Sequence, residues 1–267
     1  QPRSRGLGDV YKRQADAEGL IDSAADTLVG GKRLRARFCH AGWQAVARFG
    51  DRDAEESAAL WDVCAALEIF QSAALVHDDL IDNSDTRRGR PAAHRALESA
   101  HVGAGWRGDP AAFGRSSAIL LGDLLVAWSD DLLEDAIEPL PHAAAVRREY
   151  GRMRRDVTVG QFLDIAEESA WSVHATDSHV ERALRVVSFK SARYSIEQPL
   201  VLGAAIADAD DDQLLALRRF GHPVGMAFQL RDDLLGVYGD AAVTGKPAGD
   251  DLREGKRTVL VLSLIHI

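Results

Sequence analysis

Two short acidic stripes inside apolar helical runs constrain the fold of this chain more than any other feature. The first reads Asp-Asp-Leu-Ile-Asp at residues 78–82, and the second reads Asp-Asp-Leu-Leu at residues 232–235. On a helix, Asp78 and Asp82 are four residues apart and share one face, with Asp79 beside them. Carboxylates packed on one stripe repel one another unless a counter-charge is bound. The chain must therefore fold so that a cation meets both stripes.

The number of hard oxygen ligands in these stripes predicts a magnesium site. Mg²⁺ binds few protein carboxylates, keeps several waters and shares its remaining positions with the phosphates of a substrate. The predicted metal ligands are five aspartates: Asp78, Asp79, Asp82, Asp232 and Asp233. Two acidic helices of this kind indicate a phosphorylated ligand.

Basic residues beside glycines supply the positive half of such a site. Gly-Gly-Lys-Arg-Leu-Arg occupies residues 30–35, and Arg-Arg-Gly-Arg follows the first stripe at residues 87–90. Arg and Lys side chains bind phosphate oxygens. Further basic residues are Lys190, Lys246 and Lys256. A lysine in a polar loop is more often solvated than ligand-binding, and the arginines after the stripe have the alternative role of neutralising the aspartates.

Helical periodicity persists through nearly every segment, which predicts one all-α domain. Four Ala- and Leu-rich runs contain few helix breakers: residues 58–76, 117–133, 181–206 and 213–235. No long Pro, Gly or Ser linker divides the 267 residues, and strand signals are nearly absent. Loops are expected at residues 103–105, 108–110, 139–141 and 207–212.

Charge and composition exclude several classes of function. The net charge is −9, and the cations form no continuous basic face, so we expect no nucleic-acid partner. The residues Asp123, Glu197 and Arg231 interrupt the longest apolar stretches, and none reaches the roughly 20 clean residues of a transmembrane helix. We therefore expect a cytoplasmic protein. Cys39 and Cys64 have no partner at metal-ligand spacing and are expected to be reduced core thiols.

The motifs, taken in order, resemble those of the trans-isoprenyl diphosphate synthases, the polyprenyl synthetase family, from about Gly30 to about Leu260. The series comprises Gly-Gly-Lys-Arg-Leu-Arg, His-Asp-Asp-x-x-Asp with Arg-Arg-Gly, Gly160-Gln161 with Asp164, Lys190-Ser191-Ala192, Phe-Gln-Leu-Arg-Asp-Asp, and the loops around Lys246 and Lys256. The resemblance implies an all-α, single-domain bundle of long antiparallel helices around a central cavity, the isoprenoid synthase type I fold. It also implies a Mg²⁺-dependent prenyltransferase that condenses isopentenyl diphosphate with an allylic diphosphate.

The resemblance further implies a role for each matching residue. The five aspartates would hold Mg²⁺ on the diphosphate of the allylic substrate, and with Lys190 they form the predicted catalytic set. Positions that bind the diphosphate of isopentenyl diphosphate are matched by Lys32, Arg35, Gln71 and Arg88. Contacts to the allylic diphosphate are matched by Arg87, Lys190, Gln229, Lys246 and Lys256. Two positions depart from the family: Gln71 stands where many relatives carry His, and Gly236 replaces the last aspartate of the second motif.

Product length in this family depends on residues about one turn before the first acidic motif, which form the floor of the tunnel that receives the growing chain. Ala73 and Ala74 are small, and Phe70 is the first bulky side chain further upstream. An open floor predicts geranylgeranyl diphosphate, with longer all-trans products as the close alternative. The two alanines have the alternative role of allowing close helix packing. The resemblance also implies a homodimer.

Both ends of the chain resemble translated read-through of a sequencing adapter. Residues 1–14 and 262–267 are expected to be non-native tails, with a basic targeting arm as the alternative for the first. Residues 15–261 are expected to form a polyprenyl synthetase domain that lacks its C-terminal helices.

Two other functions remain open. A class I terpene cyclase of the same fold also uses an Asp-rich motif and Mg²⁺, but it needs no second diphosphate site at Lys32, Arg35 and Arg88. A non-catalytic regulatory subunit of a prenyl synthase would be expected to lose the aspartates that are present here. Solvated helix faces in an ordinary bundle are the least favoured explanation of the two stripes.

Overall fold

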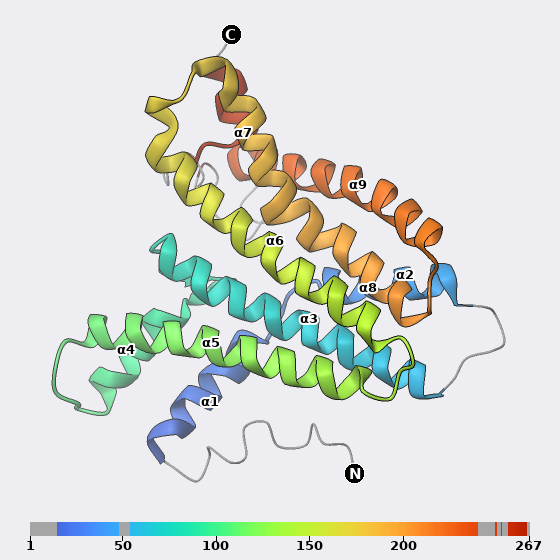
Figure 1. The fold of residues 1–267 in the computed structure, drawn as a ribbon. Helices are drawn as coiled ribbons and strands as arrows, with labels where there is room; N and C mark the ends of the chain where they lie inside the picture. Colours follow the sequence, from blue (N-terminus) through green and yellow to red (C-terminus); the bar gives the residue numbers. More distant parts are fainter. Residues whose placement is uncertain (1–14, 48–53, 240–248, 250–251, 253–255, 266–267) are drawn as a thin grey trace. The chain divides into compact units, whose positions relative to one another are not determined.

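The computed structural model describes residues 15–47, 54–239, 249, 252 and 256–265. These residues are mostly helical, so the all-α prediction is confirmed (Figure 1). They form two compact units. The first consists of the described residues up to 36 together with 61–138, and the second consists of the described residues of 37–60 and those from 139 onward.

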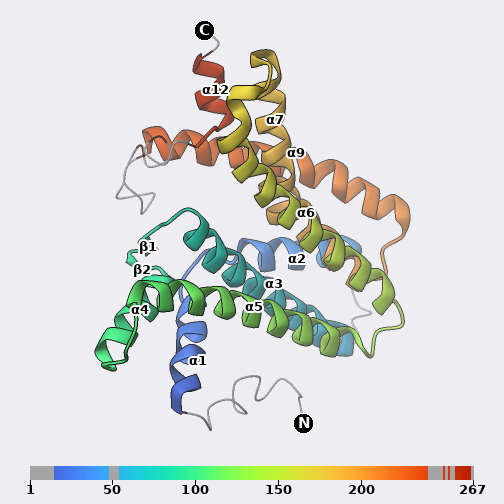
Figure 2. The same ribbon diagram turned by 60° about the vertical axis from the view of Figure 1, so that its left-hand side comes forward.

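The first unit is built on a pair of long helices. Its helices are α1 (Ala15–Thr27), α3 (Ala54–Ile81, of which residues 61–81 belong here), α4 (Ala93–Gly103) and α5 (Pro110–Ile137). α3 and α5 lie side by side (Figures 1 and 2), and the Ser129 hydroxyl donates a hydrogen bond of 2.6 Å to the Ala66 carbonyl between them. A buried apolar cluster joins all four helices: Ala24, Ala73, Val76, Leu97, Ala118, Leu121 and Leu125. Burial of this surface is the main force that holds the unit together.

A short β-hairpin follows α3 (Figure 2). Its strands, β1 (Thr86–Arg87) and β2 (Arg90–Pro91), pair antiparallel with Arg87 opposite Arg90. The connecting residues Arg88 and Gly89 have φ of 53° and 73°, as a two-residue type I′ turn requires. The sequence did not predict this hairpin. Its turn brings three arginines to the acidic end of α3.

The second unit contains one helical run that is buried against two long helices. Its elements are α2 (Leu34–Val46, of which residues 37–46 belong here), α6 (Ala143–Ala170), η2 (Trp171–Val173), η3 (Thr176–Ser178), α7 (His179–Val186), η4 (Val187–Glu197), α8 (Gln198–Ile206), α9 (Asp211–Tyr238) and α12 (Val259–Ile265). α7, η4 and α8 are continuous, η4 has π-helical geometry, and every residue of α8 is buried. η4 packs against both α6 and α9. π-Helices are rare and often lie at functional sites.

A network of buried charges links α6, η4 and α9. Arg218 of α9 bonds Glu149 of α6, and its Nη1 lies 3.4 Å from Oε1 of Glu197 in η4. The side chains of Glu149 and Glu197 are 5% and 10% exposed. His222 Nδ1 is 2.9 Å from the other carboxylate oxygen of Glu197. Because a buried charge without a partner is very costly, these pairs favour one arrangement of the three helices.

Two helices of the described chain are long and apolar enough to cross a membrane, by length and composition alone. They are residues 56–81 of α3 and the whole of α5, and 56% and 28% of their apolar windows are buried within the fold. Acidic residues interrupt both, at Asp62 and Glu68 in α3 and at Asp123 in α5. Neither therefore has the roughly 20 uninterrupted apolar residues that a bilayer core requires. Cys39 and Cys64 are both buried, as expected of core thiols.

Candidate functional site

The first acidic stripe occupies the last turn of α3 and the residue that follows it. The Asp78 side chain is 21% exposed, whereas that of Asp79 is 4% exposed. Asp82 is half-buried, and its backbone N–H donates a hydrogen bond of 2.8 Å to the Asp78 carbonyl. This bond continues the helical spacing beyond α3, so Asp78 and Asp82 lie on one face, as the sequence predicts.

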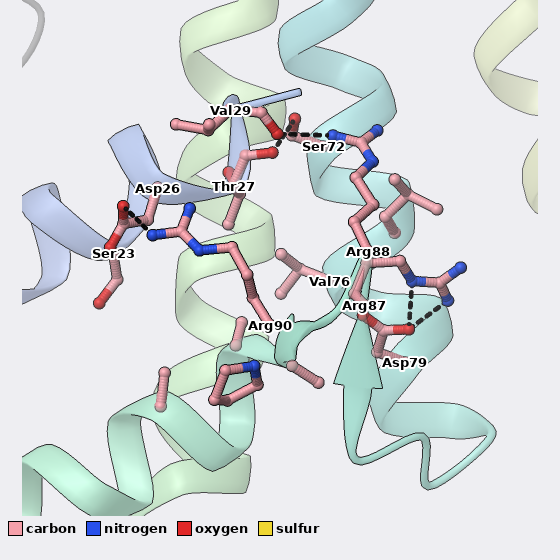
Figure 3. A pocket seen from close by; sticks show the side chains of 15 residues that line it. Ser23, Asp26, Thr27, Val29, Ser72, Val76, Asp79, Arg87, Arg88 and Arg90 are labelled. Carbon is pink, nitrogen blue, oxygen red and sulfur yellow. Dashed lines mark hydrogen bonds and ion pairs between the residues drawn. The ribbon is translucent and has the colours of Figure 1, made fainter. Parts of the chain in front are cut away.

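Arg87 of the hairpin binds the buried member of this stripe. Its Nε lies 2.8 Å from Asp79 Oδ1, and its Nη2 bonds the same oxygen (Figure 3). Nη2 also lies 3.6 Å from Asp78 Oδ2. Burial raises the pKa of the Asp79 carboxyl, and the hydrogen bonds and charge of Arg87 act in the opposite direction. Arg87 therefore orients Asp79 and partly neutralises the stripe.

The other two hairpin arginines have different partners around a pocket lined by α1, α3, α4 and the hairpin (Figure 3). Arg90 pairs with Asp26 of α1 at 3.3 Å. Arg88 Nη1 donates a hydrogen bond of 2.9 Å to the Val29 carbonyl, and no carboxylate of the described residues forms an ion pair with it. Burial lowers the pKa of Arg88, the nearby Arg33 and Arg87 lower it further, and the carboxylates of Glu68 and Asp79 act in the opposite direction. Arg88 is thus a cation without a paired carboxylate among the described residues, which suits an anionic ligand.

The basic segment at residues 30–35 belongs to the same unit as Arg88, and Gly31 lies against the Arg88 guanidinium. Lys32 is exposed, while Arg35 at the start of α2 and Gln71 of α3 are half-buried. The structure thus brings Gly31 and the hairpin together, and the binding of isopentenyl diphosphate by this segment stays a prediction.

Sequence reasoning missed Glu68, which fixes this segment to α3. Its Oε2 lies 3.4 Å from Arg33 Nη1, and its Oε1 accepts the Ala36 backbone N–H at 3.2 Å. The available signal was an acidic residue inside the apolar run of α3, which contains only two acidic residues, Asp62 and Glu68, before the stripe. Its partner is Arg33, the first arginine of the Gly-Gly-Lys-Arg-Leu-Arg motif, for which the sequence predicted no role.

In the second unit, η4 holds Lys190 against α6. Lys190 Nζ is 2.5 Å from Asp164 Oδ2, and Arg193 Nη1 is 3.0 Å from Asp156 Oδ2. The backbones of α6 and η4 approach so closely at Gly160 that a Cβ built there would lie 2.3 Å from the backbone nitrogen of Lys190. The Gly160 and Asp164 positions belonged to the sequence motif series, whereas the pair of Asp156 and Arg193 was missed.

The second acidic stripe lies near the C-terminal end of α9. Asp232 is exposed and Asp233 is 5% exposed. Gln229, one turn earlier, donates a hydrogen bond of 2.9 Å from Nε2 to Asp233 Oδ1. The glutamine therefore orients the buried carboxylate of the motif. Lys256 is half-buried ahead of α12, and Lys246 lies outside the described residues.

The predicted chain-length residues differ in their surroundings on α3. Phe70 and Ala73 are buried, and Ala73 packs in the apolar cluster with Leu121 of α5. Ala74 is half-buried and stands one turn before Asp78 on the same helix face. Close helix packing, the alternative role, therefore fits Ala73. Ala74 lies on the helix face that carries Asp78. Product length stays a prediction.

The donor set of the first stripe fits a magnesium ion that is completed by other ligands. Within the part of the chain that the structure describes, no group of three or more His, Cys, Asp or Glu side chains is placed to hold a metal ion. Asp78 and Asp82 carry oxygen donors one helical turn apart, and Arg87 contacts both Asp79 and, at 3.6 Å, Asp78. A structural zinc site would need a closed set of four protein ligands, but Mg²⁺ takes most of its ligands from water and phosphate.

Comparisons with known proteins identify the family to which the chain is similar. Residues 18–267 match the model of a family described as polyprenyl synthetase. The chain is 37% identical over 204 residues to the geranylgeranyl diphosphate synthase of Mycobacterium tuberculosis, which covers 76% of this chain and 52% of that protein. It is 33% identical over 236 residues to the geranylfarnesyl diphosphate synthase of Aeropyrum pernix, which covers 87% of this chain and 66% of that protein.

A solved structure gives the same result at the level of the fold. Geranylgeranyl pyrophosphate synthase from Corynebacterium glutamicum, complexed with isoprenyl diphosphate and magnesium, is similar with a TM-score of 0.83 and 42% sequence identity. The match covers 98% of this chain and 76% of that one. The chain spans 52% and 66% of the two curated relatives named above, and thus about half to two thirds of their length.

Proposed function

The chain belongs to the polyprenyl synthetase family and has its all-α isoprenoid synthase fold; on this premise we propose that it condenses isopentenyl diphosphate with an allylic diphosphate to give all-trans prenyl diphosphates. The observation that carries the proposal is the hairpin after α3. It places Arg87 on the aspartates and Arg88 beside the Gly-Gly-Lys segment. One short element thus contributes to both predicted diphosphate sites.

The predicted metal ligands Asp78, Asp79, Asp82, Asp232 and Asp233 would hold Mg²⁺ on the allylic diphosphate. When bound, Mg²⁺ neutralises the negative charge that develops on the departing diphosphate oxygens. Within the protein, Arg87 and Gln229 orient the two buried carboxylates, Asp79 and Asp233. Preorganised donors and acceptors of this kind contribute to catalysis because they need no rearrangement when the charge develops.

The cationic side chains bind and orient the two substrates. Lys190, with Arg87, Gln229, Lys246 and Lys256, would bind the allylic diphosphate. Asp164 holds Lys190 Nζ at 2.5 Å before substrate arrives, which limits the freedom that this lysine loses on binding. Lys32, Arg35, Gln71 and Arg88 would bind isopentenyl diphosphate.

The reaction then needs no protein nucleophile. The allylic carbon–oxygen bond breaks to give a delocalised carbocation and free diphosphate, and the double bond of isopentenyl diphosphate attacks the cation to form the new carbon–carbon bond. The proton lost from the resulting cation passes to the released diphosphate. Two substrates held in place make this step effectively intramolecular, and an apolar wall protects the cation from water.

The finer features of the activity belong to the same proposal. The half-buried Ala74 leaves the floor open, which favours geranylgeranyl diphosphate, with longer products as the alternative. A homodimer, which the family resemblance implies, belongs to the same proposal. We further propose a cytoplasmic location, with Mg²⁺ as the metal.

The decisive experiment incubates the full-length protein with Mg²⁺, isopentenyl diphosphate and each of the dimethylallyl, geranyl and farnesyl diphosphates. Products are dephosphorylated and identified by mass. Linear all-trans prenols are expected, and their length identifies the product. Cyclic hydrocarbons formed without isopentenyl diphosphate would indicate a terpene cyclase, and a folded protein that binds Mg²⁺ without turnover would indicate a regulatory subunit.

A further inference from the structure

We propose that Gly31 is a positioning residue for isopentenyl diphosphate: the space left by its missing side chain is where the Arg88 guanidinium lies. This inference rests on the proposed function and deepens it. It assigns to the second glycine of the Gly-Gly-Lys motif a role in substrate affinity, acting through a side chain 57 positions further along the sequence.

The geometry at Gly31 is specific to the guanidinium group. A Cβ built on Gly31 would lie 2.8 Å from Nη2, 3.1 Å from Cζ and 3.3 Å from Nη1 of Arg88. All three distances are shorter than an ordinary contact, which begins at 3.4 Å. The guanidinium therefore lies directly against the backbone at Gly31. Any residue other than glycine at position 31 would place its Cβ where the guanidinium lies.

The neighbouring backbone holds the same group from a second direction. Arg88 Nη1 donates a hydrogen bond of 2.9 Å to the Val29 carbonyl (Figure 3). Gly31 has φ of 87°, in the left-handed region that glycine adopts without strain. The turn over residues 29–31 thus supplies a hydrogen-bond acceptor, the Val29 carbonyl, and a backbone surface at Gly31 on which the guanidinium rests. Together they fix the guanidinium.

These contacts orient Arg88 without neutralising it. The partners in the turn are uncharged backbone groups, and no carboxylate of the described chain forms an ion pair with Arg88. Arg33 and Arg87 add positive charge nearby, and the carboxylates of Glu68 and Asp79 add negative charge without forming an ion pair with Arg88. An arginine held in this way keeps its charge and its remaining N–H donors for an anion, and a diphosphate accepts such donors well. The anion of the proposed function at this position is isopentenyl diphosphate.

An alanine at Gly31 is expected to move the guanidinium and leave the fold intact. The clashing atoms are the far end of a flexible side chain, which swings away more easily than a backbone moves. Gly30 provides a matched control because its φ is 79°, so alanine imposes a similar backbone strain there. A Cβ on Gly30 would lie 3.8 Å from Arg88 Cδ and 4.0 Å from Nη1, which are ordinary contacts.

The test measures the affinity of the full-length protein for isopentenyl diphosphate by calorimetry, together with steady-state kinetics. Gly31→Ala is expected to weaken isopentenyl diphosphate binding by about tenfold or more, the usual worth of a charge-assisted hydrogen bond. The KM for the allylic diphosphate, and kcat at saturating isopentenyl diphosphate, should stay within about twofold. Gly30→Ala should lower the Tm as much as Gly31→Ala but keep near wild-type affinity.

A double-mutant cycle separates positioning from a general disturbance of the loop. If Gly31 acts through Arg88, then Gly31→Ala adds little further loss of affinity in an Arg88→Ala background. If the losses of affinity in Gly31→Ala and Arg88→Ala simply add, or if Gly31→Ala and Gly30→Ala bind isopentenyl diphosphate equally well, the inference is overturned. Turnover by the wild type would still uphold the proposed function in either case. A wild-type protein that binds isopentenyl diphosphate without forming product refutes the proposed function, and the binding comparison still decides the inference. No binding to the wild type overturns both.

Discussion

Replacing Gly160 by alanine should force α6 away from the π-helix that carries Lys190. The new Cβ would lie 2.3 Å from the nitrogen and 2.6 Å from the Cα of Lys190. These are backbone atoms, so no change of rotamer relieves the contact. Restoring an ordinary separation of about 3.5 Å moves η4 by roughly 1 Å. Overpacking of this kind costs about 1–3 kcal/mol, partly offset by about 0.5–1 kcal/mol from the higher helix propensity of alanine, so we expect a net loss of about 1–2 kcal/mol.

Gly151 on the same helix is the control for this substitution. Its Cβ would lie 3.2 Å from Arg155 Nη1, the end of a flexible side chain, so Gly151→Ala should stabilise the protein by about 0.5–1 kcal/mol. Urea unfolding followed by far-UV circular dichroism measures both values. The KM for the allylic diphosphate should also rise in Gly160→Ala, because Lys190 moves with η4. If Gly160→Ala were as stable as Gly151→Ala, the close approach of α6 and η4 would be refuted.

Other substitutions test the remaining parts of the structure. Asp78→Ala or Asp232→Ala, like removal of Mg²⁺ by a chelator, should lower turnover at least about a hundredfold with little change in Tm; retained turnover in either variant would contradict the metal assignment. Ala74→Phe should shorten the prenyl product read by mass, whereas Ala73→Phe should mainly lower stability, since Ala73 is fully buried; an unchanged product spectrum in Ala74→Phe would place the floor elsewhere. Arg218→Met leaves two buried glutamates without their main cation and should cost about 3–5 kcal/mol in urea unfolding; a loss below about 1 kcal/mol would show that the network is solvated.

Helices were predictable from the sequence where composition decides them. Three of the four Ala- and Leu-rich runs fall within α3, α5 and α9, and the fourth, residues 181–206, spans α7, η4 and α8. α5 and α9 extend beyond their runs because capping groups set their first residues. Asp109 caps α5, because its side chain accepts the Ala111 N–H at 2.9 Å and the helix then begins with a proline at its first position. α9 begins at a capping box in which Asp210 and Gln213 exchange hydrogen bonds of 2.8 and 3.0 Å.

The hairpin and the π-helix were not predictable because long-range packing determines them. Arg88-Gly89 is a weak turn signal, and its strands are two residues each. The π-helix depends on close approaches at both sides: Gly160 meets Lys190, and a Cβ on Gly225 of α9 would lie 2.5 Å from the Ala192 carbonyl. The sequence of residues 187–197 alone does not indicate which residues of α6 and α9 will pack against it.

The sequence identified the charged groups of the candidate site but not their partners. Arg87 was expected at the allylic diphosphate, and the structure shows it on Asp79. Asp164 was part of the motif series without a stated role, and the structure pairs it with Lys190. Such pairings depend on the packing of elements that are distant in sequence, which residue type alone does not specify.

The π-helix between α7 and α8 also bears on how this stretch of chain can change in length. A π-turn accommodates one residue more than an α-turn, so deleting a single residue within 187–197 would let the run wind as an ordinary α-helix. The deletion removes the residue that the wider turns absorb, so the elements on either side keep their register while the side chains within 187–197 change direction. α8 is buried and packs closely on α2, since a Cβ on Gly203 would lie 1.7 Å from the Cys39 carbonyl oxygen, so its register has to be kept. Single-residue insertions and deletions are therefore a route by which related sequences can re-aim the lysine of η4 while the hydrophobic helix behind it keeps its place.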